Sequence, residues 1–114
     1  MTRPLPQTSL QTSPYEQISL GRRIVLQEAQ TLARLADHMP ADFHRVVQML
    51  SECRGAALVS GIGKAGWIGQ KLSATLASTG TRSHFVHPGE AMHGDLGRFG
   101  PEDLLLVLLS LIHI

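Results

Sequence analysis

Regularly spaced glycines and a lysine among them give residues 60–71 the features of a phosphate-binding turn. The run reads SGIGKAGWIGQK, and Gly61, Gly63 and Gly66 follow the G-x-G-x-x-G spacing of a dinucleotide-binding turn, with Lys64 in its middle. Such a turn joins a strand to a helix, so free backbone N–H groups and the positive end of the helix dipole face the same point. We therefore predict an anion site here. The alternative is that these glycines serve only a tight turn and close packing of the helix on the sheet.

The anion that this turn fits best is a small phosphate ester. The G-x-x-x-x-G-K-[ST] pattern of nucleoside triphosphate loops is absent, because Lys64 comes too early and is followed by Ala65. A dinucleotide site also needs an acidic residue about 20 positions further on, at the end of the next strand. Here that strand ends in Val86, His87 and Pro88, which leaves a nicotinamide dinucleotide as the lesser alternative.

A second group of chemically active side chains lies in the run HFVHPGEAMHGDLG and comprises His84, His87, Glu90, His93 and Asp95. Imidazole rings move protons near neutral pH and bind transition metals. Three positions apart on a strand, His84 and His87 are predicted to point to opposite faces, whereas His87 and His93 flank a turn and could converge. The cluster predicts a proton-transfer or metal site beside the phosphate turn. The alternative is a solvated loop with incidental histidines.

The elements that position these residues follow from the apolar pattern. Residues 1–15 hold three prolines and no apolar periodicity, so we predict a disordered leader. Helical periodicity over residues 16–39 and again over 43–53 predicts two N-terminal helices. The remainder of the chain changes to short apolar runs separated by glycines and prolines, which is typical of strands.

Three such runs, at 55–61, 82–87 and 104–110, predict strands. A helix from near Ala65 to a left-handed C-cap at Gly80 joins the first two. Strands that alternate with helices predict an α/β fold with a parallel sheet. The third run is apolar throughout, so we expect both faces of that strand to be covered.

Composition excludes several classes of partner. The 114 residues suffice for about one domain, and a net charge of +1 with scattered Lys and Arg argues against nucleic-acid binding. The single cysteine, Cys53, excludes an internal disulfide and fits a reducing compartment. No apolar run is long enough for a signal peptide or a membrane span, so we predict a cytoplasmic chain without a membrane partner.

The run GIGKAGWIGQKLSATLASTGTRSHFVHPGEAMHGDLG strongly resembles the sugar isomerase (SIS) domain of the arabinose-5-phosphate isomerases. The resemblance covers roughly residues 18–110, and its H-P-x-E-A-x-H-G-D-L-G part is the specific one. It implies a parallel-sheet, flavodoxin-like sandwich preceded by two helices. It also implies interconversion of D-arabinose 5-phosphate and D-ribulose 5-phosphate for 3-deoxy-D-manno-octulosonate and lipopolysaccharide synthesis, in a homo-oligomer (a tetramer). A phosphosugar-binding regulatory SIS domain and an isomerase of another phosphosugar are the alternatives.

The resemblance also implies roles for individual residues. It assigns catalytic roles to Lys64 and His93, needs no cofactor, and makes His87 the ligand of a regulatory or inhibitory zinc ion. The substrate-binding positions that it implies are Gly61, Gly63, Gly80, Thr81, His87 and His93.

Three departures from the family pattern qualify these expectations. Ala65 stands where serine is usual, and Trp67 where histidine is frequent. The third strand runs into LLSLIHI instead of a serine-rich S-N-S-G-E-[ST] turn, which in this family holds the phosphate and leads to a functional glutamate. The ending LSLIHI matches a translated end sequence of a common transposon-based sequencing adapter. We therefore expect a partial SIS domain over 16–110, a non-native tail over 111–114, and a chain that is inactive alone.

Overall fold

The computed structural model describes residues 12–109 and divides the chain into two compact units, with the boundary in the sequence between Ala41 and Asp42. The first unit contains the helix α1 (Pro14–Asp37). This helix begins two residues earlier than predicted, because Ser13 and Glu16 form a reciprocal capping box with bonds of 3.2 and 2.7 Å. Residues 1–11 of the predicted leader and the predicted tail at 111–114 lie outside the described range.

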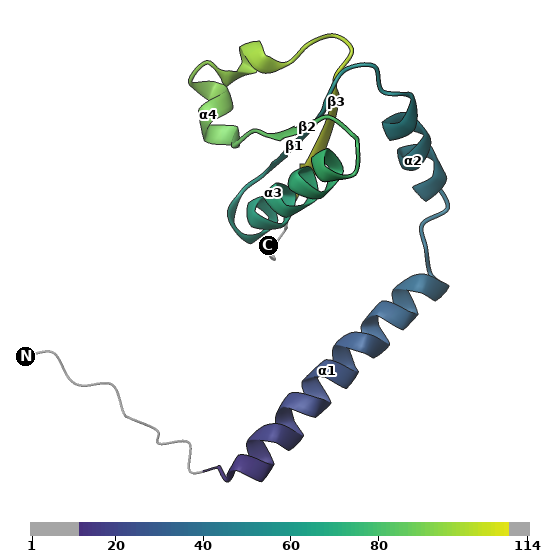
Figure 1. Cartoon of the computed structure of the whole chain (residues 1–114), viewed down its shortest axis with the longest axis vertical. Helices are drawn as coiled ribbons and strands as arrows, with labels where there is room; N and C mark the ends of the chain where they lie inside the picture. The colour runs from purple at the N-terminus through teal and green to yellow at the C-terminus, as the bar shows by residue number, and fades with distance from the viewer. Residues whose placement is uncertain (1–11, 110–114) are drawn as a thin grey trace, which may run out of the picture. The chain divides into compact units, whose positions relative to one another are not determined.

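The second unit contains a three-stranded parallel sheet with strand order β2-β1-β3 (Figure 1). This architecture confirms the predicted α/β fold with a parallel sheet. Its strands and helices, in chain order, are α2 (Phe43–Glu52), β1 (Ala57–Gly61), α3 (Gly63–Ser78), β2 (Ser83–Phe85), α4 (Pro88–Met92), the 3-10 helix η1 (Asp95–Arg98) and β3 (Leu104–Leu108).

The two connections between strands lie on opposite faces of the sheet (Figure 1). Helix α3 leads from β1 to β2, and Gly69 on this helix faces Val59 of β1 so closely that a Cβ there would lie 3.2 Å from the valine side chain. The segment from α4 through η1 leads back across β1 to β3. It covers the other face through a core of Leu58 and Val86 with Ala91 and Phe99. The sheet therefore lies between α3 and the α4–η1 segment.

The C-terminal end of α3 confirms the predicted cap at Gly80. This glycine has a φ of 99°, and its N–H donates to the carbonyl of Ala77 at 3.3 Å. The next N–H, of Thr81, donates to Leu76 O at 2.9 Å, which completes a Schellman motif. The motif turns the chain directly into β2.

Asp103 fixes the turn that precedes β3. One carboxylate oxygen accepts the N–H of Ala56 at 2.7 Å and the other accepts that of Gly100 at 2.6 Å. These two backbone bonds hold the pKa of Asp103 below its ordinary value, and the nearby charge of Arg82 adds to the effect. The start of β1 and the start of β3 are thereby tied together.

The environment of β3 differs from the sequence prediction. We expected both faces to be covered, yet Leu105 and Val107 are 49% and 52% exposed within the described part of the chain. Their register partners are Leu58 and Ser60, so they lie on the face that carries the α4–η1 segment. That segment packs on the core around Leu58 and leaves these two side chains of the edge strand uncovered.

No helix within residues 12–109 has the length and apolar character that crossing a membrane requires.

Candidate functional site

The glycine turn between β1 and α3 brings backbone atoms close together at two of the three glycines of its motif. A Cβ on Gly61 would lie 2.9 Å from the carbonyl oxygen of Leu108, and one on Gly66 would lie 2.7 Å from that of Gly61. Gly63 has open space around it but adopts a φ of 63°, in the left-handed region that favours glycine. Close contacts at Gly61 and Gly66 and the positive φ of Gly63 therefore favour glycine at each position of the motif.

The turn leaves backbone donors available at the start of α3. The N–H of Gly66 closes the first turn onto the carbonyl of Ile62 at 3.3 Å. The preceding N–H groups, of Gly63, Lys64 and Ala65, have no acceptor within the helix. Ile62 occupies the N-cap position without a side-chain bond to them. These donors and the exposed ammonium of Lys64 form a cationic end that suits a phosphate.

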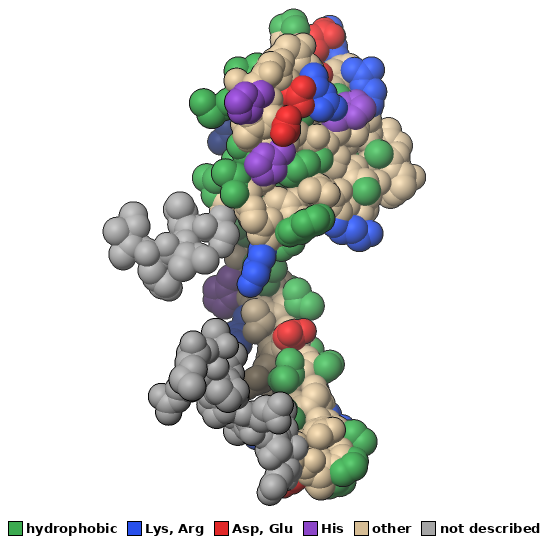
Figure 2. Space-filling model, turned by 90° about the vertical axis from the view of Figure 1, so that its left-hand side faces the viewer, with side chains coloured by type: hydrophobic (Ala, Val, Ile, Leu, Met, Phe, Trp, Pro, Cys, Tyr) green, Lys and Arg blue, Asp and Glu red, His purple; other side chains and the backbone are tan. Residues whose placement is uncertain are grey.

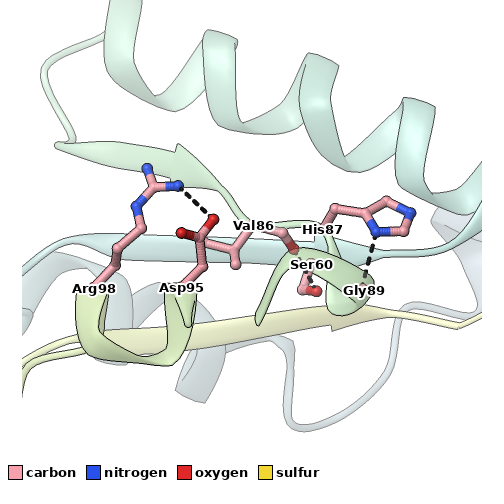
Figure 3. Close-up of polar contacts among 6 residues, drawn as sticks. All are labelled: Ser60, Val86, His87, Gly89, Asp95 and Arg98. Carbon is pink, nitrogen blue, oxygen red and sulfur yellow. Dashed lines mark hydrogen bonds and ion pairs between the residues drawn. The ribbon is translucent and has the colours of Figure 1, made fainter. Parts of the chain in front are cut away.

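His87 lies at the same edge of the sheet as the glycine turn. It follows β2 just as the turn follows β1, and the carboxyl ends of parallel strands meet at one edge. Its Nδ1 accepts the N–H of Gly89 at 3.0 Å, which caps α4 (Figure 3). A neutral ring that accepts at Nδ1 carries its proton on Nε2. The Nε2–H is therefore the group that His87 offers to a ligand.

An open groove of about 620 Å³ runs along β2 between α3 and the α4–η1 segment. Figure 2 shows histidine, acidic and basic side chains gathered on the face of the molecule that carries this segment. The ion pair between Arg98 and Asp95, at 3.5 Å, lies at the groove (Figure 3). The titratable side chains that line it are His84, His87, Glu90, Asp95 and Arg98.

His84 and His87 both line this groove, although the sequence predicts that they point to opposite faces of the sheet. The two statements are compatible, because β2 is an edge strand and the groove is lined from both faces, by residues of α3 and by residues of the α4–η1 segment. The opposite orientation of the two side chains therefore stays a prediction.

The structure separates other residues that the sequence analysis grouped. His93 caps the C-terminal end of α4, is exposed, and is not among the described residues that line the groove. Gly80 and Thr81 precede β2, so they lie at the amino edge of the sheet, opposite Lys64 and His87. There they line a smaller cavity of about 340 Å³. Within one chain, Gly61, Gly63, Lys64 and His87 share an edge, and Gly80 and Thr81 do not.

A zinc site needs at least two ligands in addition to His87. Among residues 12–109, no three histidine, cysteine, aspartate or glutamate side chains are placed so that they could hold one metal ion. His87 in the observed orientation accepts a hydrogen bond at Nδ1 and so presents a protonated nitrogen. The described residues of a single chain therefore do not form a complete zinc site.

Sequence reasoning missed Ser60. This buried side chain donates from Oγ to the carbonyl of Val86 at 2.7 Å (Figure 3). A serine at the end of an apolar strand gives no motif of its own. The only available signal was a hydroxyl within an otherwise apolar run, at a position predicted to be buried.

Comparison with known proteins identifies one domain family and several similar isomerases. The SIS domain family matches residues 49–110. The arabinose 5-phosphate isomerase GutQ of Escherichia coli K12 is 46% identical over 91 residues, which are 80% of this chain and 28% of that protein. The arabinose 5-phosphate isomerase KdsD of Yersinia pestis is 46% identical over 88 residues, or 77% of this chain and 27% of that protein. The chain thus spans less than a third of the length of these two relatives.

A solved structure with the same arrangement is that of E. coli CFT073 c3406 in complex with arabinose 5-phosphate. It superposes with a TM-score of 0.79 at 35% sequence identity and covers 84% of this chain and 51% of that one. The structural similarity thus extends over most of this chain.

Proposed function

Because the chain belongs to the SIS domain family, we propose that it takes part in the interconversion of D-arabinose 5-phosphate and D-ribulose 5-phosphate. The observation that carries this proposal is the glycine turn, where Lys64 and free backbone N–H groups face the edge of the sheet that also holds His87. The names of the isomerases GutQ and KdsD, and the arabinose 5-phosphate in the c3406 structure, support this choice of substrate.

The reaction requires a held phosphate and two proton-transfer groups. A proton leaves C2 of the aldose and another is added at C1, while the hydroxyl proton at O2 passes to the carbonyl oxygen at C1, through an enediol. The glycine turn holds the phosphate and Lys64 adds charge to it. The Nε2–H of His87 suits polarisation of the carbonyl, and His93, at the far end of α4, is the second proposed proton-transfer residue.

Binding at the turn is testable because Trp67 is the only tryptophan of the chain. It lies in α3 three residues after Lys64 and is 71% exposed, so its fluorescence reports on ligands at the turn. We expect D-arabinose 5-phosphate to change this fluorescence and unphosphorylated D-arabinose to leave it unchanged. Equal responses to the two sugars would contradict a phosphate site.

Lys64→Ala is the variant that tests the assignment, and Lys71→Ala is its matched control. Both lysines are exposed on α3, and only Lys64 belongs to the turn. Loss of a charge-assisted bond worth roughly 1.5–3 kcal/mol should weaken binding of D-arabinose 5-phosphate about 10- to 150-fold in Lys64→Ala. Lys71→Ala should bind within about twofold of the wild type. Similar affinities in the two variants would remove Lys64 from the site.

Formation of product would separate an isomerase from a regulatory SIS domain. D-ribulose 5-phosphate, detectable by a colorimetric ketose assay, would identify an isomerase and would overturn the expectation that this chain is inactive alone. A regulatory domain binds the phosphosugar without converting it.

We also infer a cytoplasmic homo-oligomer, of the tetrameric kind that the family resemblance implies. The uncovered side chains of β3 are consistent with association of subunits.

A further inference from the structure

The hydroxyl of Ser60 joins the two segments that form the proposed site. Ser60 directly precedes Gly61 of the glycine turn, and its acceptor, the carbonyl of Val86, directly precedes His87 (Figure 3). The bond is 2.7 Å long, and Ser60 is 9% exposed. One short buried bond therefore connects the phosphate end of the site to its histidine end.

The backbone alone does not make this connection. The register of β1 and β2 ends with Val59 opposite Phe85. One further backbone bond follows, from the N–H of Val86 to the carbonyl of Val59 at 2.8 Å. At the next step the carbonyl of Val86 receives the Ser60 hydroxyl, where a longer ladder would supply a backbone N–H. The serine thus extends the pairing by one bond, to the residue before His87.

We infer that Ser60 is a positioning residue, which sets the placement of His87 relative to Lys64 and the glycine turn. This inference rests on the proposed function of that site. Ser60 acts through the carbonyl of Val86, and its hydroxyl is engaged within the protein. The reaction is sensitive to such placement, since a displacement of about 1 Å can lower a rate roughly 100-fold.

The chain contains a matched control at the opposite edge of the sheet. Ser83 is 8% exposed, and its Oγ donates to the carbonyl of Ala57 at 2.7 Å. This bond also joins β2 to β1, but at the amino ends of the strands. Ser83 Oγ additionally lies 2.8 Å from Ser73 Oγ, so its removal should destabilise the protein at least as much as removal of the Ser60 hydroxyl.

The experiment compares Ser60→Ala, Ser83→Ala and Ser60→Thr in the 114-residue chain, with affinities followed by Trp67 fluorescence. For Ser60→Ala we expect the affinity for D-arabinose 5-phosphate to fall about threefold to tenfold, because the contact of His87 with the sugar is weakened, while the affinity for inorganic phosphate stays within about twofold of the wild type. Ser83→Ala should keep both affinities despite an equal or larger loss of melting temperature. Ser60→Thr retains the hydroxyl and should restore the affinity for D-arabinose 5-phosphate to within about twofold of the wild type.

A readout without substrate distinguishes failure of this inference from failure of the proposed function. In ¹H–¹⁵N spectra of the ligand-free chain, Ser60→Ala should shift the amide of Gly89, whose N–H bonds to the His87 ring, and Ser83→Ala should not. Equal shifts in both variants, an unshifted Gly89 in Ser60→Ala, or equal losses of affinity for D-arabinose 5-phosphate in the two alanine variants would overturn the positioning role. Absence of phosphosugar binding in the wild type, with the expected Gly89 shifts, would reject the proposed function alone.

Discussion

Replacement of Gly66 by alanine tests whether close backbone contact at the glycine turn outweighs helix propensity. In the interior of a helix, alanine is favoured over glycine by about 0.5–1 kcal/mol. At Gly66, however, the new Cβ would lie 2.7 Å from the carbonyl oxygen of Gly61 and 3.1 Å from its carbon. Overpacking costs about 1–3 kcal/mol, and a backbone carbonyl cannot rotate away as a side chain can. We expect a net loss of roughly 1–2 kcal/mol in the free energy of unfolding.

The assay is thermal unfolding followed by circular dichroism, with Gly97→Ala as the control. Gly97 lies in η1 with a φ outside the left-handed region, and a Cβ there meets no described atom within 4 Å. For a domain of this size each kcal/mol lowers the melting temperature by about 4–8 °C, so Gly66→Ala should melt several degrees below the wild type. Gly97→Ala should melt near it. A Gly66→Ala variant that melts at or above the wild-type temperature would refute the close contact.

Three further predictions concern the metal, the pH dependence and the edge strand. Because the described residues of one chain form no complete zinc site, zinc titrated by calorimetry should bind the wild type and His87→Ala equally weakly, and tighter binding by the wild type would make His87 a ligand. The lowered pKa of Asp103 stabilises the fold above the ordinary aspartate value near 4 and loses this contribution as the pH falls through the lower folded value. Asp103→Asn should therefore be less stable at pH 7 and show a shallower loss of stability below pH 4 in urea titrations. Val107→Lys, on the uncovered face of β3, should reduce self-association in sedimentation velocity, and an unchanged oligomer would place the subunit contact elsewhere.

The local features of the fold could be predicted from the sequence because neighbouring residues determine them. The strand that ends in the glycine turn, the C-cap at Gly80 and the helix Phe43–Glu52 all follow from patterns within a few positions. The capping box that starts α1 at Pro14 was equally local, and the S-x-x-E pattern of Ser13 and Glu16 could have revealed it. This capping box depends on no contact between distant segments of the chain.

The features that the sequence did not predict depend on contacts between distant segments. The exposure of Leu105 and Val107 follows from the strand order, which places β3 at an edge, and an apolar run does not reveal that order. The shared groove of His84 and His87 follows from the position of β2 at an edge of the sheet, where one groove is lined from both faces, and alternation along the run RSHFVH does not reveal that position. The position of Thr81 at the opposite edge from Lys64 likewise becomes visible only once the strands are paired.

The strand order also explains why Ser60 occupies the position where a side-chain bond is needed. The chain moves from β1 to β2 on one side and then back across β1 to β3, with its connections on opposite faces. After Phe85 it must therefore leave β2 and pass onto the face opposite α3, and backbone pairing with β1 cannot continue through that change of direction. A hydroxyl on β1 can reach the departing backbone where a ladder bond cannot, and Ser60 does so at the last residue before His87. In parallel sheets, ligands bind at the carboxyl ends of the strands, where the chain changes direction. Because backbone pairing ends at that point, His87 is supported by the side chain of Ser60 on the neighbouring strand β1.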